Sequence, residues 1–320
     1  MQESGLAQKV ERTLSELETI GVEPTLSRKI YVKIVKAGFN RATLASAFVL
    51  MQLAAQFQPI NVRGLMYRAI GLLYPDSSDK SYNQTSHVVL KLRRAGIMPF
   101  SWIVDSTRRR LKPSTWTSLA DFAQAVANAY RKDLWTNQKH HVEIFSEKDA
   151  MVGVVEPVTE ALDVHCNIIR GQNSETSVYN TAEEWNQIKK PIYVYYIGDH
   201  DPDGFRIETS LKSRLAGYCD RPFEWERLAI SPSDFADQSL RGYPLKTTSK
   251  RGQPLAEASW KPYFDQYGDR CVEVDAVPPD VIRQRIRQAI ESHIDTGKWK
   301  RLQRIEAQER EDWAEQIHAD

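Results

Sequence analysis

Hydrophobic side chains in the first hundred residues recur every three or four positions, which is the spacing of amphipathic helices. The first such stretch carries Leu6 and Val10 and ends before Gly21, and the last one ends at Gly96, a frequent residue after a helix. The pattern predicts four helices, over residues 5–20, 42–57, 62–73 and 82–95.

A strand is predicted directly after these helices, from the short apolar run Phe100 to Val104. Three helices followed by a β-ribbon fit a winged helix, in which the last helix can enter the DNA major groove. That helix ends in the basic residues Lys91, Arg93 and Arg94, which suit phosphate contacts. The alternative is a helical domain that merely has a basic surface.

The second half of the chain alternates predicted strands with predicted helices, which indicates a parallel sheet in an α/β fold. The strands are expected over residues 141–147, 164–169 and 192–199. The run Ile192 to Ile197 is continuously apolar, as in strands that are covered on both faces. A polar loop over residues 242–257 precedes a helix that begins at Pro278 and Pro279, and a charged helical tail follows.

The chain has 320 residues, which is enough for two domains at ~100–200 residues each. We predict an α/β protein in which a winged-helix domain precedes a domain with the parallel sheet. The predicted divisions are an N-terminal helical extension (1–40), a winged-helix DNA-binding domain (41–117), a helical connector (118–140), an α/β domain (141–240), and a loop with C-terminal helices (241–320).

Composition indicates the cellular compartment of the protein. The least charged stretch, residues 42–59, falls short of the ~20 apolar residues of a membrane span, and the N-terminus lacks the pattern of a signal peptide. The cysteines Cys166, Cys219 and Cys271 are far apart and form no metal-spaced pair. We expect a cytoplasmic protein in a reducing compartment, with no membrane partner.

Basic residues are concentrated in one part of the chain, although the net charge is only +1. Between residues 91 and 112 there are seven of them and a single acid, Asp105. Double-stranded DNA is a partner that such a stretch fits, and the alternative is a solvated charged face. The candidate DNA contacts are Lys91, Arg93, Arg94, Arg108 and Arg109.

Acidic residues follow two of the predicted strands. Glu147 ends the first strand, and Asp199 and Asp201 follow the apolar run that ends at Ile197. If these strands are neighbours in a parallel sheet, the carboxylates share one crevice at the carboxyl ends of the strands. Carboxylates that are packed together need a cation or protons, and their oxygens suit Mg²⁺. We therefore predict a Mg²⁺ site, which Mn²⁺ can also occupy.

Each carboxylate also has an ordinary structural explanation. Asp201 precedes Pro202, which is typical of a residue that caps a helix beginning with proline. Asp203 would then favour the positive end of the same helix, and Glu147 would form an ion pair with Lys148.

These motifs resemble those of a known family. Glu147 after one strand and the sequence G-D-H-D-P-D-G (residues 198–204) after another resemble the Toprim domain of topoisomerases and primases. The sequence R-G-L-M-Y (Arg63 to Tyr67) resembles the R-x-x-(Y/F)-Y motif of the topoisomerase VI A subunit and of its relative, the meiotic double-strand-break transesterase. The likeness covers about residues 60–290, and it extends to stand-alone bacterial and phage members of the superfamily.

The resemblance implies that Tyr67 is the nucleophile, whose hydroxyl attacks a DNA phosphate and forms a 5′-phosphotyrosyl link. It also implies that residues 141–240 form a Toprim metal-binding domain, in which Glu147, Asp199 and Asp201 hold Mg²⁺. In the family, the tyrosine of one subunit works with the metal site of the other, so a homodimer is expected. Ser174 is a candidate phosphate contact or a residue that only forms a turn.

Tyr67 would need help to act as a nucleophile. A phenol of pKa ~10 is mostly protonated at neutral pH. Arg63 lies one helical turn before Tyr67 and is placed to stabilise the phenolate or to bind the phosphate. On a helical wheel Tyr67 lies about a quarter-turn from the centre of the apolar face, which is also typical of an ordinary amphipathic aromatic residue.

The sequence thus predicts a DNA topoisomerase-like transesterase that is associated with the nucleoid. The chain contains no G-x-x-x-x-G-K-[ST] motif, so strand passage would need a separate ATPase partner subunit. Two other functions remain open. One is a hydrolytic Toprim nuclease in phage defence or DNA processing, in which Tyr67 is structural. The other is a non-catalytic DNA-binding subunit of a larger complex.

Overall fold

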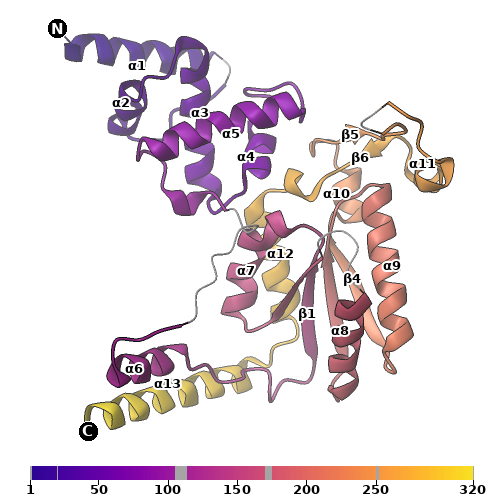
Figure 1. The fold of residues 1–320 in the computed structure, drawn as a ribbon. Coiled ribbons are helices and arrows are strands. Elements are labelled where there is room, and N and C mark those ends of the chain that lie inside the picture. The colour runs from indigo at the N-terminus through magenta and orange to yellow at the C-terminus, as the bar shows by residue number, and fades with distance from the viewer. Residues whose placement is uncertain (1, 20, 105–113, 170–174, 250–251, 320) are drawn as a thin grey trace.

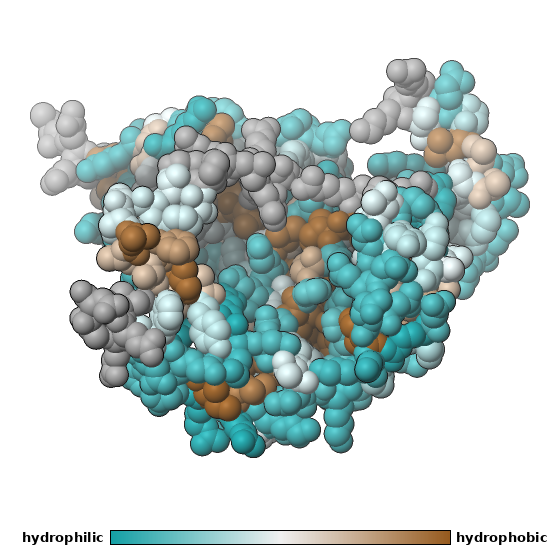
Figure 2. Space-filling view, turned by 60° about the horizontal axis from the view of Figure 1, so that its bottom comes forward, coloured by the Kyte–Doolittle hydropathy of each residue, from teal (hydrophilic) through white to brown (hydrophobic). Residues whose placement is uncertain are grey.

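A computed structural model describes residues 2–19, 21–104, 114–169, 175–249 and 252–319 of the chain. The fold is mixed α/β, with a group of helices at the N-terminal end and a four-stranded parallel sheet further along the chain (Figure 1). None of the described helices combines the length and hydrophobicity that a membrane crossing requires. The face shown in Figure 2 is mainly hydrophilic, with hydrophobic residues in small separate groups.

The N-terminal group of helices is built around one apolar helix, α3. Phe48, Leu50 and Met51 of this helix are buried, and the neighbouring helices pack around it. Asn61 and Ser78 cap the starts of α4 and α5, because their side chains accept backbone N–H bonds that the helices leave unpaired. The helices are α1 (Gln2–Glu18), α2 (Arg28–Lys36), α3 (Arg41–Phe57), α4 (Val62–Ala69) and α5 (Asp79–Arg94).

This helical group differs from the sequence prediction in several details, the first being helix α2, which was not predicted. The predicted strand from Phe100 to Val104 is wrong, since the segment contains a short 3-10 helix, η1 (Phe100–Trp102), and only Ile103 pairs, in a single bridge to Ile60. Helix α4 ends at Ala69, four residues before the predicted end. Gly71 adopts a left-handed φ of 86°, which turns the chain out of the helix.

The parallel sheet has the strand order β2-β1-β3-β4, which confirms the prediction of an α/β fold with parallel strands. Helices α7 and α12 pack against one face of the sheet, and α8 and α9 cover the other face (Figure 1). The strands are β1 (His141–Ser146), β2 (His165–Ile168), β3 (Ile192–Ile197) and β4 (Phe223–Ala229). The helices are α7 (Val152–Ala161), α8 (Glu175–Gln187), α9 (Pro202–Tyr218) and α12 (Pro279–Glu291).

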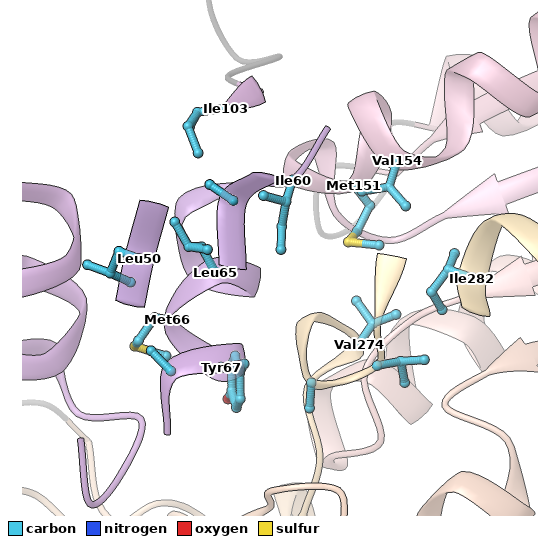
Figure 3. Close-up of a cluster of buried hydrophobic side chains, with 14 of the residues drawn as sticks. Leu50, Ile60, Leu65, Met66, Tyr67, Ile103, Met151, Val154, Val274 and Ile282 are labelled. Atoms are coloured by element: carbon cyan, nitrogen blue, oxygen red, sulfur yellow. The ribbon is translucent and has the colours of Figure 1, made fainter. Parts of the chain in front are cut away.

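One hydrophobic core joins the helical group to the sheet. Leu50 and Met66 belong to the same cluster of buried side chains as Met151, Val154 and Ile282, which lie beside the sheet (Figure 3). The two parts of the chain therefore pack on each other through apolar contacts. A second cluster fills the opposite face of the sheet, between β1, β3, α8 and α9.

Several smaller elements complete the fold. Helix α6 (Leu119–Ala129), in the predicted connector, packs on α13 (Thr296–Ala319), the predicted charged tail (Figure 1). Strand β5 (Tyr243–Pro244) lies within the predicted loop and pairs antiparallel with β6 (Arg270–Cys271), which follows that loop. The remaining elements are η2 (Asp149–Met151), α10 (Pro232–Ala236), η3 (Glu257–Ser259), α11 (Lys261–Tyr267) and η4 (Val274–Ala276).

Trp185 offers a test of the second hydrophobic cluster. Its ring is fully buried between Phe145 and Phe223, and its indole N–H donates to Glu143 Oε1 at 2.7 Å. Trp185→Ala should lower the free energy of unfolding by about 3–5 kcal/mol in a urea titration followed by circular dichroism. Tyr179→Ala on the exposed side of the same helix should cost about 1 kcal/mol or less. Equal losses in the two variants would contradict this packing.

His293 gives the fold a dependence on pH. Burial, and then the neighbouring His140, lower the pKa of His293 to about 4, and its Nε2 lies 2.7 Å from the Tyr195 hydroxyl. An unfolded histidine titrates near ~6.5, so between these values the unfolded chain binds more protons than the folded one. The free energy of unfolding should therefore fall as the pH falls through this window. His293→Gln should flatten that slope in urea titrations, and an unchanged slope would refute the assignment.

Candidate functional site

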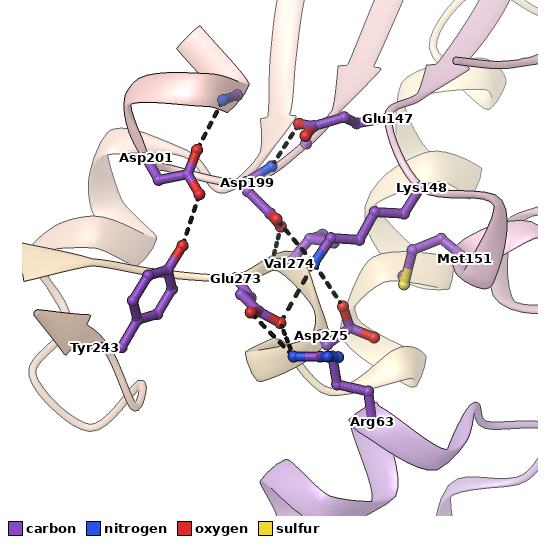
Figure 4. Close-up of polar contacts among 12 residues, drawn as sticks. Arg63, Glu147, Lys148, Met151, Asp199, Asp201, Tyr243, Glu273, Val274 and Asp275 are labelled. Atoms are coloured by element: carbon purple, nitrogen blue, oxygen red, sulfur yellow. Dashed lines mark hydrogen bonds and ion pairs between the residues drawn. The ribbon is translucent and has the colours of Figure 1, made fainter. Parts of the chain in front are cut away.

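The first two acidic residues of the site follow neighbouring strands, the condition on which their meeting was expected. Strands β1 and β3 pair in parallel, with Ser146 opposite Ile197, and Glu147 and Asp199 come just after them. The backbone N–H of Asp199 donates to Glu147 Oε2 at 3.0 Å (Figure 4). Both side chains therefore lie at the carboxyl edge of the sheet, where open α/β sheets bind their ligands.

Two glycines allow the chain to approach Glu147 so closely. A Cβ atom at Gly198 would lie 2.5 Å from Glu147 Oε2, and one at Gly204 would lie 2.4 Å from the carbonyl oxygen of Asp199. Neither position has room for a side chain. The glycines of the G-D-H-D-P-D-G sequence thus have a direct steric role at the edge of the sheet.

Asp201 has the capping role that the following proline indicated. Its side chain accepts the Gly204 N–H at 2.7 Å at the start of α9, which begins at Pro202. Its other carboxylate oxygen accepts the Tyr243 hydroxyl at 2.6 Å, so strand β5 holds it in place. Asp203 lies away from these residues and forms an exposed ion pair with Arg206.

Lys148 is surrounded by carboxylates. Its ammonium nitrogen lies 2.8 Å from Asp199 Oδ2, 2.9 Å from Asp275 Oδ2 and 3.4 Å from Glu273 Oε2. The lysine therefore joins the end of β1 to two other segments of the chain (Figure 4). The sequence offered Glu147 as the ion-pair partner of Lys148, whereas the structure pairs Lys148 with these three other carboxylates.

Glu273 and Asp275 were missed as site residues. The segment that carries them runs beside the loop after β3, because His200 and Val272 exchange two backbone hydrogen bonds. The Val274 N–H then donates to Asp199 Oδ1 at 2.8 Å. We refer to the five acids gathered here as the carboxylate cluster, which consists of Glu147, Asp199, Asp201, Glu273 and Asp275.

The start of helix α4 is fastened to this cluster. Arg63 donates to both carboxylate oxygens of Glu273, each at 3.2 Å. Asn61 donates to Asp275 Oδ1 at 2.9 Å while its own oxygen caps α4 through the Gly64 N–H. The structure thus brings Arg63 to the carboxylates, from a part of the chain more than eighty residues earlier than Glu147.

Tyr67 lies on the same helix but is buried. Its side chain is only 4 % exposed and belongs to the hydrophobic core (Figure 3). Within the described residues its hydroxyl makes no hydrogen bond of normal geometry. Burial, and then the charge of Glu273, raise the pKa of this hydroxyl above its ordinary value. The quarter-turn displacement on the helical wheel therefore does not expose Tyr67, since residues after β6 cover it.

The charges of the cluster are not balanced. Five carboxylates have two cations at ion-pair distance, Lys148 and Arg63, which leaves three negative charges when all are ionised. A third cation, Arg227, acts on Glu147 from further away and is paired with Glu208. Burial, and then Glu147 and Glu273, raise the pKa of Asp199 to about 7 in spite of the nearby ammonium. Burial and Asp201 raise the pKa of Glu147 as well. By contrast, Lys148 overcomes burial and lowers the pKa of Asp275.

A large cleft opens beside the carboxylate cluster. Its volume is about 1320 Å³, and residues from α4, α5 and the loops after the strands line it. Arg93, Arg241 and Lys246 add positive charge to its walls. A cleft that is lined by both carboxylates and basic residues is suited to a phosphate chain, which needs both a cation and positive contacts.

The donors at the sheet edge are carboxylate oxygens, the type of ligand that a hard divalent cation prefers. No three acidic, histidine or cysteine side chains in the part of the chain that the structure describes are grouped closely enough to enclose a metal ion by themselves. Mg²⁺, however, needs only one or two carboxylates, with water and substrate phosphate as the other ligands. One cation, the ammonium of Lys148, already contacts the carboxylate oxygens of Asp199 and Asp275. Glu147, Asp199 and Asp201 are the residues that would hold the metal.

The predicted DNA contacts lie in several places. Arg93 lines the cleft and lies over the Phe100 ring, while Lys91 donates to the Gly38 carbonyl and lies over Phe39. Arg94 is exposed at the end of α5. Three further predicted contacts, Arg108, Arg109 and Ser174, lie outside the described residues.

Comparisons of this chain with protein-family models, with curated proteins and with solved structures found no match.

Asp275 tests how strongly the fold depends on the cluster. Its side chain is 1 % exposed and pairs with Lys148. Asp275→Asn should lower the free energy of unfolding by about 2–4 kcal/mol, since it weakens a buried ion pair in which Lys148 keeps two other partners. Asp203→Asn, in an exposed pair of the same region, should change it by about 0.5 kcal/mol or less. Urea titrations of both variants measure these changes. An Asp275→Asn variant with an unchanged free energy of unfolding would refute the prediction.

Proposed function

We propose that this chain is a Mg²⁺-dependent DNA-cleaving transesterase that works as a homodimer and resembles the topoisomerase VI A subunit. One observation carries the proposal. Helix α4, which bears Arg63 and Tyr67, is docked on the carboxylates that follow two neighbouring parallel strands. Of the residues that the family motifs single out, Arg63, Asp199 and Asp201 line one cleft, and Tyr67 lines a second one.

The same proposal assigns the two parts of the fold. Residues 41–117 act as a winged-helix DNA-binding domain, supported by helices α3 to α5 and by the basic end of α5. Within the described residues the strand expected after α5 is reduced to the bridge between Ile103 and Ile60, so the helices alone carry this assignment. Residues 141–240 act as a Toprim domain, supported by the parallel sheet with an acid after β1 and the D-x-D sequence after β3. DNA is then the partner that brings the protein to the nucleoid.

Tyr67 carries the chemical step of this proposal. Its hydroxyl oxygen attacks a DNA phosphorus, loses its proton to a base, and forms a bond to the 5′ phosphate. The bond from that phosphorus to the 3′ oxygen breaks, and the 3′ oxygen leaves with a proton. Arg63 binds the phosphate through its guanidinium once it is released from Glu273. When Mg²⁺ is bound at Glu147 and Asp199, it supplies positive charge to the phosphate oxygens.

The buried position of Tyr67 sets a condition on this chemistry. A hydroxyl inside the hydrophobic core cannot reach a phosphate. Helix α4 must therefore separate from residues 273–277, which breaks the pair of Arg63 with Glu273 and the hydrogen bond of Arg68 with the Ala276 carbonyl. Binding of DNA between two subunits, with each tyrosine working at the metal site of the other, is the event that we assign to this opening. Strand passage would further require an ATPase partner subunit.

A second function is favoured by the same burial. If α4 stays docked, Tyr67 is a core residue, and the carboxylate cluster serves a hydrolytic Toprim nuclease in which water attacks the phosphate. This nuclease uses the same cleft and the same metal ligands. It differs from the transesterase in the product, which is a free DNA end.

A denaturing gel of end-labelled double-stranded DNA, incubated with protein and Mg²⁺ or Mn²⁺, separates these functions. The transesterase should leave protein on the 5′ end, so that the band shifts after protease treatment. Tyr67→Phe should abolish this product, with a loss of at least ~100-fold, because no other group replaces the nucleophile. Tyr74→Phe is the matched control, since Tyr74 is also buried and its hydroxyl makes no hydrogen bond of normal geometry among the described residues.

Three other outcomes have distinct meanings. Free DNA ends in equal amounts from the wild type and Tyr67→Phe would replace the transesterase by the hydrolytic nuclease. Equal loss in Tyr67→Phe and Tyr74→Phe would indicate damage to the core rather than a missing nucleophile. If the protein binds DNA but cleaves it with neither Mg²⁺ nor Mn²⁺, the result would favour a non-catalytic DNA-binding subunit.

A further inference from the structure

We propose that Lys148 permanently occupies one of two cation positions in the carboxylate cluster, so that this site takes a single divalent metal ion. The position of the ammonium is formed by Asp199, Glu273 and Asp275, which lie within 3.4 Å of it. The other position is on the side of Glu147 and Asp201. This inference rests on the proposed function only in taking the cluster as a metal site.

The contacts around Lys148 hold it firmly in place. Asp275, its most deeply buried partner, is itself fixed by the Asn61 amide at 2.9 Å. Asp199 is fixed through its second oxygen by the Val274 N–H. The lysine side chain is only 22 % exposed, so an ion that displaced it would leave an ammonium without partners in a largely buried place. Displacement is therefore unfavourable, and the ammonium stays.

The opposite side of the cluster still needs a cation. Glu147 has no basic partner at ion-pair distance among the described residues, and Asp201 is held by neutral donors, the Gly204 N–H and the Tyr243 hydroxyl. Lys148 and Arg63 pair only with Asp199, Glu273 and Asp275, and the next cation, Arg227, acts on Glu147 from beyond ion-pair distance and is itself paired with Glu208. A carboxylate has about four lone-pair sites, so Asp199 can contact an ion on this side while it keeps its bond to Lys148.

This arrangement differs from sites in which two metal ions clamp the attacking and leaving oxygens of a phosphate at ~3.5–4 Å from each other. Here the second positive charge belongs to the chain itself. Lys148 is thus a positioning residue that fixes the number of ions. The ion that remains is a hard divalent cation such as Mg²⁺ or Mn²⁺, because every donor on that side is an oxygen.

The test counts Mn²⁺ ions bound to the full-length chain without DNA, by equilibrium dialysis and by native mass spectrometry. The wild type should bind one ion per chain. Lys148→Met, which has a similar shape and no charge, should bind two, because Asp199 and Asp275 then lack a cation while Glu273 keeps only Arg63. Lys148→Arg keeps the charge and should bind one. Glu147→Gln should weaken the single wild-type ion by at least ~10-fold, and in the Lys148→Met background it should leave one ion.

Several results would overturn the inference. It would fail if the wild type bound two Mn²⁺ ions or none, or if Lys148→Met bound only one. The inference would also fail if Lys148→Arg bound as many ions as Lys148→Met. If Lys148→Met does not fold without metal, the wild-type count and the Glu147→Gln count still decide the matter. The count is independent of cleavage, so a chain that binds one Mn²⁺ but forms no DNA adduct would keep this inference and lose the proposed function.

Discussion

The contact between one ammonium and three carboxylates is the interaction on which the rest of the site depends. Parallel strands bring their carboxyl ends to one edge of the sheet, and here this edge collects Asp199 together with Glu273 and Asp275 from a segment more than seventy residues later. So many like charges repel each other in a buried place unless a cation lies among them. Lys148 is that cation, and its position at the end of β1 explains how two distant loops are held against the same strand.

Much of the fold could be predicted because its elements are marked locally in the sequence. The continuous apolar run of β3, the capping residue before α9 and the double proline before α12 each identify an element without knowledge of its neighbours. Elements with a weaker local pattern were missed. Strand β4 lies at the sheet edge and alternates exposed charged residues with half-buried ones, and α2 has basic residues on either side of its apolar positions. The run at Phe100 has the composition of a strand but finds only one residue to pair with.

The candidate site could be predicted to the extent that it follows from the topology of the sheet. Glu147 and Asp199 come together because β1 and β3 are neighbours. The alternation of strands and helices indicates a parallel sheet, but it does not give the order of the strands. Glu273 and Asp275 join them through a backbone pairing of His200 with Val272, and no periodicity in the sequence announces that contact. The burial of Tyr67 was unpredictable for a similar reason. A helical wheel gives the face on which a side chain lies, but it does not give the segment that covers that face.

Asn61 shows how tightly the two parts of the chain are joined. The side-chain oxygen of Asn61 accepts the Gly64 N–H at the start of α4, and its side-chain nitrogen donates to the Asp275 carboxylate. The first turn of α4 and the loop that carries Asp275 therefore form a single cooperative unit, because neither end of the amide can be released without disturbing the other. Water would enter both places in one opening event. A displacement of the start of α4 would thus pull directly on the Asp275 carboxylate, through the one side chain that connects them.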